Sequence, residues 1–180
     1  MIHLLDVNVL LALGYTAHVH NNRAETWLQL LQTHNSTVNL AMCSITELGF
    51  VRVACGKAGF AANVRVAQRD LAQLKAKHPF SFLQDGLDAS LLPSWVERSK
   101  HVTDGHLLEL AHAHGARLVT LDQGIPGALL IPEQPEKTPM VREPPARYGD
   151  VQVAWTVLTP HKLTARRKVA LADRRGYALR

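Results

Sequence analysis

The sequence lacks features that mark membrane and secreted proteins. No apolar run approaches the ~18 residues of a membrane-spanning helix. The apolar N-terminus has no basic residues before it and contains Asp6 and Asn8, so we interpret it as mature structure rather than a signal peptide. Only two cysteines are present, Cys43 and Cys55. We therefore expect free thiols, a cytoplasmic location and no membrane partner.

Zinc motifs and internal repeats are missing as well. The two cysteines do not form a CxxC pair and no HExxH helix is present, so a zinc site has little support. What remains is an ordinary globular composition, with 47% hydrophobic and 19% charged residues in a chain of 180 residues. That length is enough for one domain with a proper core.

Short apolar runs alternate with segments of helical periodicity over the first 131 residues. This alternation is typical of an α/β domain with a mainly parallel sheet. Strands are expected at residues 2–5, 38–42, 79–83, 117–121 and 128–131. Helices are expected at residues 9–15, 21–33, 44–54, 61–77, 91–99 and 104–114, the last ended by Gly115.

The character of the chain changes after residue 131. Five prolines fall within residues 132–147, which is typical of a linker, and we expect a folded domain at residues 1–133. Residues 1–135 hold 10 Lys/Arg and 11 Asp/Glu, a net charge of −1, whereas residues 136–180 hold 10 and 4, a net charge of +6. Residues 134–180 are thus a Pro-rich linker and a basic C-terminal tail. The charge indicates either a nucleic-acid or acidic partner or a solvated extension.

Four acidic residues stand at the ends of the predicted elements, and each has an ordinary structural explanation. Asp6 fits a cap of the helix that follows it. The sequence SITE at residues 44–47 fits a capping box in which Glu47 reaches back to the helix start. Asp104 suits the first turn of its helix, and Asp122 suits a turn.

Taken together, the four carboxylates predict a metal site. Asp6 and Asp122 directly follow predicted strands, whereas Glu47 and Asp104 lie in the first turns of helices. Ligands of an open parallel sheet bind beyond the carboxyl ends of its strands. Carboxylates gathered there would raise one another's pKa, and a divalent cation would remove that conflict. Oxygen ligands favour Mg²⁺ or Mn²⁺, and such a site can hydrolyse phosphodiesters to a 5′-phosphate and a 3′-hydroxyl.

A resemblance to the PIN-domain family, and within it to the VapC toxins of bacterial toxin–antitoxin modules, is carried by three segments in order: LLDVNVLLAL, SITELGFVRV and VTDGHLLELAHAHGARLVTLD. It extends over residues 1 to about 131. The resemblance implies an α/β/α sandwich with a central, mainly parallel sheet. It also implies a Mg²⁺- or Mn²⁺-dependent endoribonuclease, a VapB-like antitoxin as partner, and a homodimer.

The resemblance also implies roles for particular residues. Asp6, Glu47 and Asp104 would be the principal metal ligands, with Asp122 as the fourth acid. The polar groups that orient these ligands would be Asn8, Ser44, Thr103 and Thr120. The chain departs from the family after Asp122, where Ile125 and Pro126 stand in place of an aromatic residue, and residues 136–180 have no counterpart.

Basic residues in two places are candidates for contacts with RNA phosphates. Arg52 lies five residues after Glu47. An ordinary ion pair is the alternative to a phosphate contact at Arg52, and it is slightly favoured. The tail contains the run Arg166, Arg167 and Lys168, which would bind an RNA backbone electrostatically and without sequence preference.

Three other functions stay open. A PIN-type nuclease of RNA processing would differ from a toxin in lacking an antitoxin-like reading frame just upstream. A non-catalytic RNA-binding module is opposed by the presence of all four acids. A haloacid-type phosphatase also begins with a strand that ends in Asp, but position 8 is Asn rather than a second Asp and no matching lysine motif is found.

Overall fold

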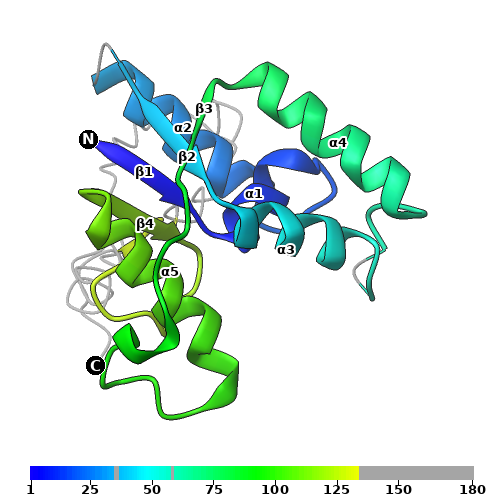
Figure 1. Ribbon diagram of the computed structural model, residues 1–180. Coiled ribbons are helices and arrows are strands. Elements are labelled where there is room, and N and C mark those ends of the chain that lie inside the picture. Colours follow the sequence, from blue (N-terminus) through cyan, green and yellow to red (C-terminus); the bar gives the residue numbers. More distant parts are fainter. Residues whose placement is uncertain (35–36, 58, 134–180) are drawn as a thin grey trace, which may run out of the picture. The chain divides into compact units, whose positions relative to one another are not determined.

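Residues 1–34, 37–57 and 59–133 are described by the computed structural model, and five of their segments form one all-parallel sheet. The strands are β1 (Ile2–Leu5), β2 (Asn39–Met42), β3 (Phe80–Phe82), β4 (Ala116–Thr120) and β5 (Leu129–Leu130). The helices are α1 (Val7–Gly14), α2 (Asn21–His34), α3 (Ser44–Ala54), α4 (Val64–Lys77) and α5 (Val102–Ala113), with short 3-10 turns η1 (Ala89–Leu91) and η2 (Ser99–His101). Figure 1 shows their arrangement.

The direction of strand order reverses at β1. The sheet order is β3-β2-β1-β4-β5, so the chain first builds outward from β1 through β2 to β3 and then returns to the other side of β1. β1 pairs with both neighbours in parallel, with Ile2 opposite Asn39 of β2 and Leu5 opposite Val119 of β4. In a parallel α/β sheet such a reversal leaves a crevice at the carboxyl ends of the two central strands.

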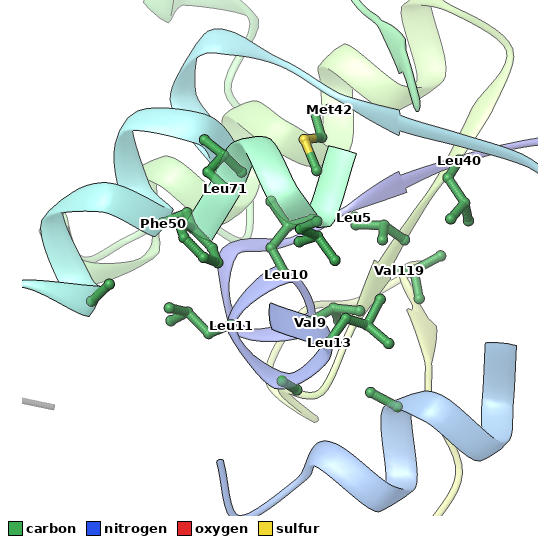
Figure 2. Close-up of a cluster of buried hydrophobic side chains, with 14 of the residues drawn as sticks. Leu5, Val9, Leu10, Leu11, Leu13, Leu40, Met42, Phe50, Leu71 and Val119 are labelled. Carbon is green, nitrogen blue, oxygen red and sulfur yellow. The ribbon is translucent and has the colours of Figure 1, made fainter. Parts of the chain in front are cut away.

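Side chains that alternate along the strands supply two cores, one on each face of the sheet. Leu5 and Val119 belong to the core that also holds α1, α2 and residues of α3 and α4, which Figure 2 shows in close-up. Leu4 and Leu118 point the other way, into the core under α5. Because helices cover both faces, the predicted α/β/α sandwich is confirmed.

Two glycines let the helices that carry Glu47 and Asp104 pack closely against their neighbours. A Cβ atom at Gly49 of α3 would lie 2.4 Å from Val7 Cγ2 at the start of α1. A Cβ atom at Gly105 of α5 would lie 2.4 Å from Val96 Cγ2. Both distances are far below ordinary carbon contacts. Glycine at these two positions therefore allows α3 to pack closely against Val7 and α5 to pack closely against Val96.

Most predicted elements are found, with two differences that have a local cause. Helix α4 begins at Val64 rather than 61, because Asn63 caps it by accepting a hydrogen bond from the Val66 N–H at 3.1 Å. The helix expected at residues 91–99 is wrong. Leu92 has an extended backbone, with φ −63° and ψ 136°, as is favoured for the residue before a proline, here Pro93.

Several predictions concern residues outside the described part of the chain, or are not tested by it. The linker, the basic tail and its residues Arg166, Arg167 and Lys168 fall in 134–180, and the domain boundary at residue 133 stays a prediction. Cys43 and Cys55 are both free thiols. Among the described helices, none combines the length and the apolar character that crossing a bilayer requires.

Candidate active site

All four predicted acids are on segments that begin or end at the carboxyl edge of the sheet. Asp6 directly follows β1, and Asp122 comes two residues after β4. Glu47 lies in the first turn of α3, which starts two residues after β2 ends. Asp104 lies in the first turn of α5, and α5 leads into β4 through only His114 and Gly115. So tight a connection reverses the chain, which brings the start of α5 to the edge where β4 ends.

Asp6 is a buried carboxylate with both oxygens engaged. Its side chain lies in a residue only 6% exposed, at the N-terminus of α1. Oδ1 accepts a hydrogen bond from the Val7 N–H at 2.6 Å, and Oδ2 accepts one from the Thr120 hydroxyl at 2.8 Å. Burial nevertheless raises the pKa of Asp6 above its ordinary value, and the charges of Asp104 and Asp122 raise it further. The predicted helix cap and the predicted site residue are thus the same side chain.

Thr120 connects the ends of β1 and β4. It is fully buried, and its hydroxyl donates to Asp6 while accepting from the Asn8 Nδ2 group at 3.1 Å and from the Asp122 N–H at 3.0 Å. Asn8 Oδ1 in turn accepts from the Leu121 N–H at 3.1 Å. One donated and two accepted hydrogen bonds use the whole capacity of a hydroxyl. The polar groups at this edge therefore have defined orientations.

Asp104 and Asp122 complete an electrostatically coupled group with Asp6. Burial raises the pKa of Asp104, and the nearby charge of Asp122 raises it further, whereas His101 and Lys100 act in the opposite direction. Asp122 is exposed, and its Oδ1 accepts a hydrogen bond from the Gly124 N–H at 2.7 Å. This is the turn that the sequence predicted. Three of the four acids thus influence one another across β1, β4 and α5.

Glu47 has a different partner. Its Oε1 forms an ion pair with Lys75 Nζ of α4 at 2.7 Å, and Glu47 is not among the groups that shift the pKa of Asp6 or Asp104. The expected capping box from residue 44 to Glu47 is wrong. The cap residue is Cys43, whose N–H donates to Thr46 Oγ1 at 3.0 Å. The Glu47 carboxylate is consequently free of the helix start.

An open groove of about 480 Å³ lies beside Glu47. Its walls come from α3, α4 and β3, and it is lined by Ser44, Glu47, Leu48, Val51, Gln68, Leu71, Ala72, Lys75 and Phe82. Leu48 and Phe82 are more than half exposed. The groove combines an apolar floor with one acidic and one basic group at the Glu47–Lys75 pair.

The donor chemistry of the four acids fits a hard divalent cation. All four offer carboxylate oxygens, and the raised pKa values of Asp6 and Asp104 reflect burial and a charge conflict that a cation would relieve. Within residues 1–34, 37–57 and 59–133, however, no three His, Cys, Asp or Glu side chains are placed so as to hold a metal ion.

The predicted supporting residues divide into two groups. Asn8 and Thr120 are hydrogen-bonded to each other and to the segments that carry Asp6 and Asp122. Ser44 and Thr103 are exposed, and no hydrogen bond joins either side chain to the four acids in the described part of the chain. Arg52 is exposed on α3, and no ion pair involves it among the residues described, so its assignment to RNA or to an ion pair stays open.

Lys75 is the residue of this region that the sequence did not reveal. Leu71 and Leu74 lie on the buried face of α4. Lys75 follows Leu74 and lies four residues after Leu71, which puts it at the rim of that face. No motif marks a lysine as the partner of an acid 28 residues earlier in the chain.

Comparisons with known proteins give relatives over most of this chain. Ribonuclease VapC38 of Mycobacterium tuberculosis (strain ATCC 25618 / H37Rv) is 39% identical over 142 residues, which cover 76% of this chain and 94% of the relative. Ribonuclease VapC44 of M. tuberculosis (strain CDC 1551 / Oshkosh) is 38% identical over 128 residues, covering 68% of this chain and 87% of the relative. No family model matches.

A solved structure resembles the fold. The crystal structure of VapBC2 from Rickettsia felis bound to a DNA fragment from their promoter contains a chain that matches with a TM-score of 0.51. The match covers 72% of this chain and 97% of that chain at 18% sequence identity. At this identity the likeness supports the α/β/α architecture and nothing finer.

Proposed function

Because this chain belongs to the VapC family of ribonucleases, we propose that it is a Mg²⁺- or Mn²⁺-dependent endoribonuclease and the toxin of a VapBC-type toxin–antitoxin module. The observation that carries the proposal is the bonded group Asp6–Thr120–Asp122 at the strand-order reversal, with Asp104 acting on it electrostatically. A buried carboxylate beside two further acids is a costly arrangement for a protein that binds no cation there.

Asp6, Glu47, Asp104 and Asp122 are the residues that we propose to hold the cation. A bound divalent cation supplies electrophilic activation of a phosphodiester and of the attacking water. Thr120 fixes the Asp6 carboxylate and the backbone at Asp122, and Asn8 fixes Thr120 in turn. These contacts support the role of Asn8 and Thr120 in orienting ligands, the part played by outer polar groups in metal sites generally.

RNA is the proposed substrate, and its backbone is the proposed target of the basic residues. Arg52 and the tail residues Arg166, Arg167 and Lys168 would neutralise phosphates, so we expect RNA binding to weaken as salt rises. The net charge of +6 in residues 136–180 supports this assignment. Arginine and lysine contacts to phosphate would add affinity without selecting a sequence.

The proposed protein partners are a VapB-like antitoxin and a second copy of this chain. The match to a chain in the R. felis VapBC2 structure is consistent with a fold that takes part in such complexes. An antitoxin-like reading frame directly upstream would support the toxin assignment over a nuclease of RNA processing. The cytoplasmic location expected from the sequence is part of the same proposal.

Replacement of Asp6 or Asp104 tests the catalytic assignment. We expect Asp6→Asn and Asp104→Asn to abolish Mn²⁺-dependent cleavage of cellular RNA by the purified protein and its toxicity on expression. EDTA should abolish cleavage by the unchanged protein. Asp88→Asn is the matched control, because Asp88 is an exposed cap of η1 whose role asparagine can take. Cleavage that survives in both folded site variants, or that resists EDTA, contradicts the proposal.

A further inference from the structure

Among the four proposed ligands, Glu47 differs because its carboxylate already holds a cation, the ammonium group of Lys75. We propose that Lys75 is a positioning residue that neutralises Glu47 and competes with the divalent cation for its carboxylate. The inference rests on the proposed function, because it takes Glu47 as a metal ligand. It goes beyond that function by assigning a role to a residue outside the four acids.

The geometry places Lys75 across the groove from the helix that carries Glu47. Lys75 belongs to α4 and Glu47 to the first turn of α3, and both line the same open groove. Leu71, one helical turn before Lys75, is buried in the core, so α4 is anchored at this point. The lysine therefore reaches Glu47 from a fixed base.

Competition follows from the contact itself. A carboxylate oxygen that accepts a hydrogen bond from an ammonium group at 2.7 Å cannot offer the same lone pair to a metal. The positive charge of Lys75 also opposes a second cation at this place. The side chains of Lys75 and Glu47 are 43% and 24% exposed, so water weakens their attraction and a divalent ion can displace the lysine.

Helix α4 contains a matched control for this ion pair. Lys77, two residues after Lys75, pairs with Glu25 of α2 at 2.8 Å, and the two side chains are 56% and 26% exposed. The two pairs thus have the same chemistry, nearly the same distance and similar exposure. Only the Lys75–Glu47 pair contains a proposed metal ligand. A general effect of removing a lysine from α4 would therefore appear when either lysine is replaced.

Mn²⁺ binding to the full chain, measured by titration calorimetry without RNA and at low salt, tests the inference. We expect Lys75→Met to bind Mn²⁺ about two- to fivefold more tightly than the unchanged protein, the range that a partly exposed ion pair allows. Lys75→Arg should stay near the unchanged protein, because arginine preserves the pair. Lys77→Met should leave the affinity unchanged.

The combined variant Glu47→Gln/Lys75→Met gives the decisive comparison. In the Glu47→Gln background, Lys75→Met should strengthen Mn²⁺ binding less than it does in the unchanged protein, because only the repulsion between Lys75 and the ion remains once the competition for the carboxylate has been removed. Unchanged or weaker Mn²⁺ binding by folded Lys75→Met would overturn the inference. So would an equal loss of thermal stability in Lys75→Met and Lys77→Met with no change in affinity, which indicates a merely structural pair.

Failure of the inference can be distinguished from failure of the proposed function. If the protein binds Mn²⁺ and Asp6→Asn abolishes that binding, but Lys75→Met changes nothing, the metal site stands and the role of Lys75 is wrong. If the unchanged protein binds no Mn²⁺ and cleaves no RNA, both the proposed function and the inference are wrong.

Discussion

The two sides of the candidate site are organised in opposite ways. On the side of β1 and β4, Thr120 uses every hydrogen-bonding position of a fully buried hydroxyl to join Asp6, Asn8 and Asp122. On the side of α3 and α4, Glu47 is held by one partly exposed lysine at the edge of an open groove. Buried hydrogen bonds hold the first side, whereas a partly exposed ion pair holds the second.

This difference shows which part of the site has a fixed side-chain geometry. Breaking a buried hydrogen bond lowers the stability of the fold. The hydrogen bonds of Thr120 to Asp6, Asn8 and Asp122 therefore keep these residues in a fixed geometry. A partly exposed ion pair is weak and is easily exchanged. We expect changes on the first side to affect both stability and activity, whereas a change at Lys75 on the second side should tune metal affinity with little effect on stability.

Removal of the Thr120 hydroxyl should have the largest effect. Thr120→Val keeps the shape but leaves Asp6 Oδ2 and the Asp122 N–H without their partner. We expect a loss of about 1–3 kcal/mol in the free energy of unfolding, from chemical denaturation. We also expect cleavage to fall about 10- to 100-fold, as for lost outer contacts of metal sites.

Thr46→Val is the control for this prediction. Thr46 is also fully buried, and its hydroxyl bonds to the backbone of Cys43 rather than to an acid. The control should lose stability but keep cleavage within a few-fold. An equal loss of cleavage per folded molecule in both variants would mean that the Thr120 group has no special place in the site.

A methyl group at Gly105 should distort the first turn of α5 next to Asp104. Its Cβ atom would meet Val96 Cγ2 at 2.4 Å and Pro93 Cδ at 3.1 Å. We expect Gly105→Ala to lower the free energy of unfolding by about 1–3 kcal/mol, because overpacking outweighs the gain in helix propensity. Val96→Ala in the same chain should restore part of the loss.

Gly86→Ala is the matched change at a place with open space, because nothing lies within 4 Å of its added Cβ atom. It should change stability by no more than about 0.5 kcal/mol. If thermal denaturation gives equal losses for Gly86→Ala and Gly105→Ala, close packing at α5 is not what limits position 105.

The smallest effect concerns pH in the metal-free protein. The pKa of Asp6 is raised by burial and by the neighbouring acids, so its ionisation opposes folding. Stability relative to Asp6→Asn is therefore greatest below the ordinary pKa of 3.8 and declines as pH rises through the raised pKa of the folded state. Urea denaturation in EDTA should show this decline. A difference that is constant or grows with pH contradicts the assigned direction.

The sequence was sufficient for the sheet and for the segments that carry the acids. The alternation of strands and helices predicted an α/β domain with a mainly parallel sheet, and the resemblance added the α/β/α layering. Helix α3 is found with the predicted bounds, Ser44–Ala54. The helix predicted at residues 91–99 is not found, because Pro93 favours an extended backbone at Leu92, the residue before it. The sequence placed Asp6 and Asp122 beyond strand ends because each directly follows a predicted strand.

Contacts between distant side chains could not be predicted in the same way. Thr120 was expected near the site from the resemblance, yet its three partners depend on the register of β1 against β4. The Lys75–Glu47 pair depends on how α3 packs against α4, which no local pattern encodes. Periodicity predicts the buried face of a helix and leaves the partners of its rim residues undetermined.

The central claim is that Asp6, Glu47 and Asp104 converge on one divalent cation. A crystal structure of the full chain grown with Mn²⁺, with the ion located by its anomalous scattering, tests this directly. The account predicts a single peak at the carboxyl edge of the sheet, with oxygen ligands from all three residues and Lys75 released from Glu47. A peak bound elsewhere, or Mn²⁺ at this edge with Glu47 still paired to Lys75, would contradict it.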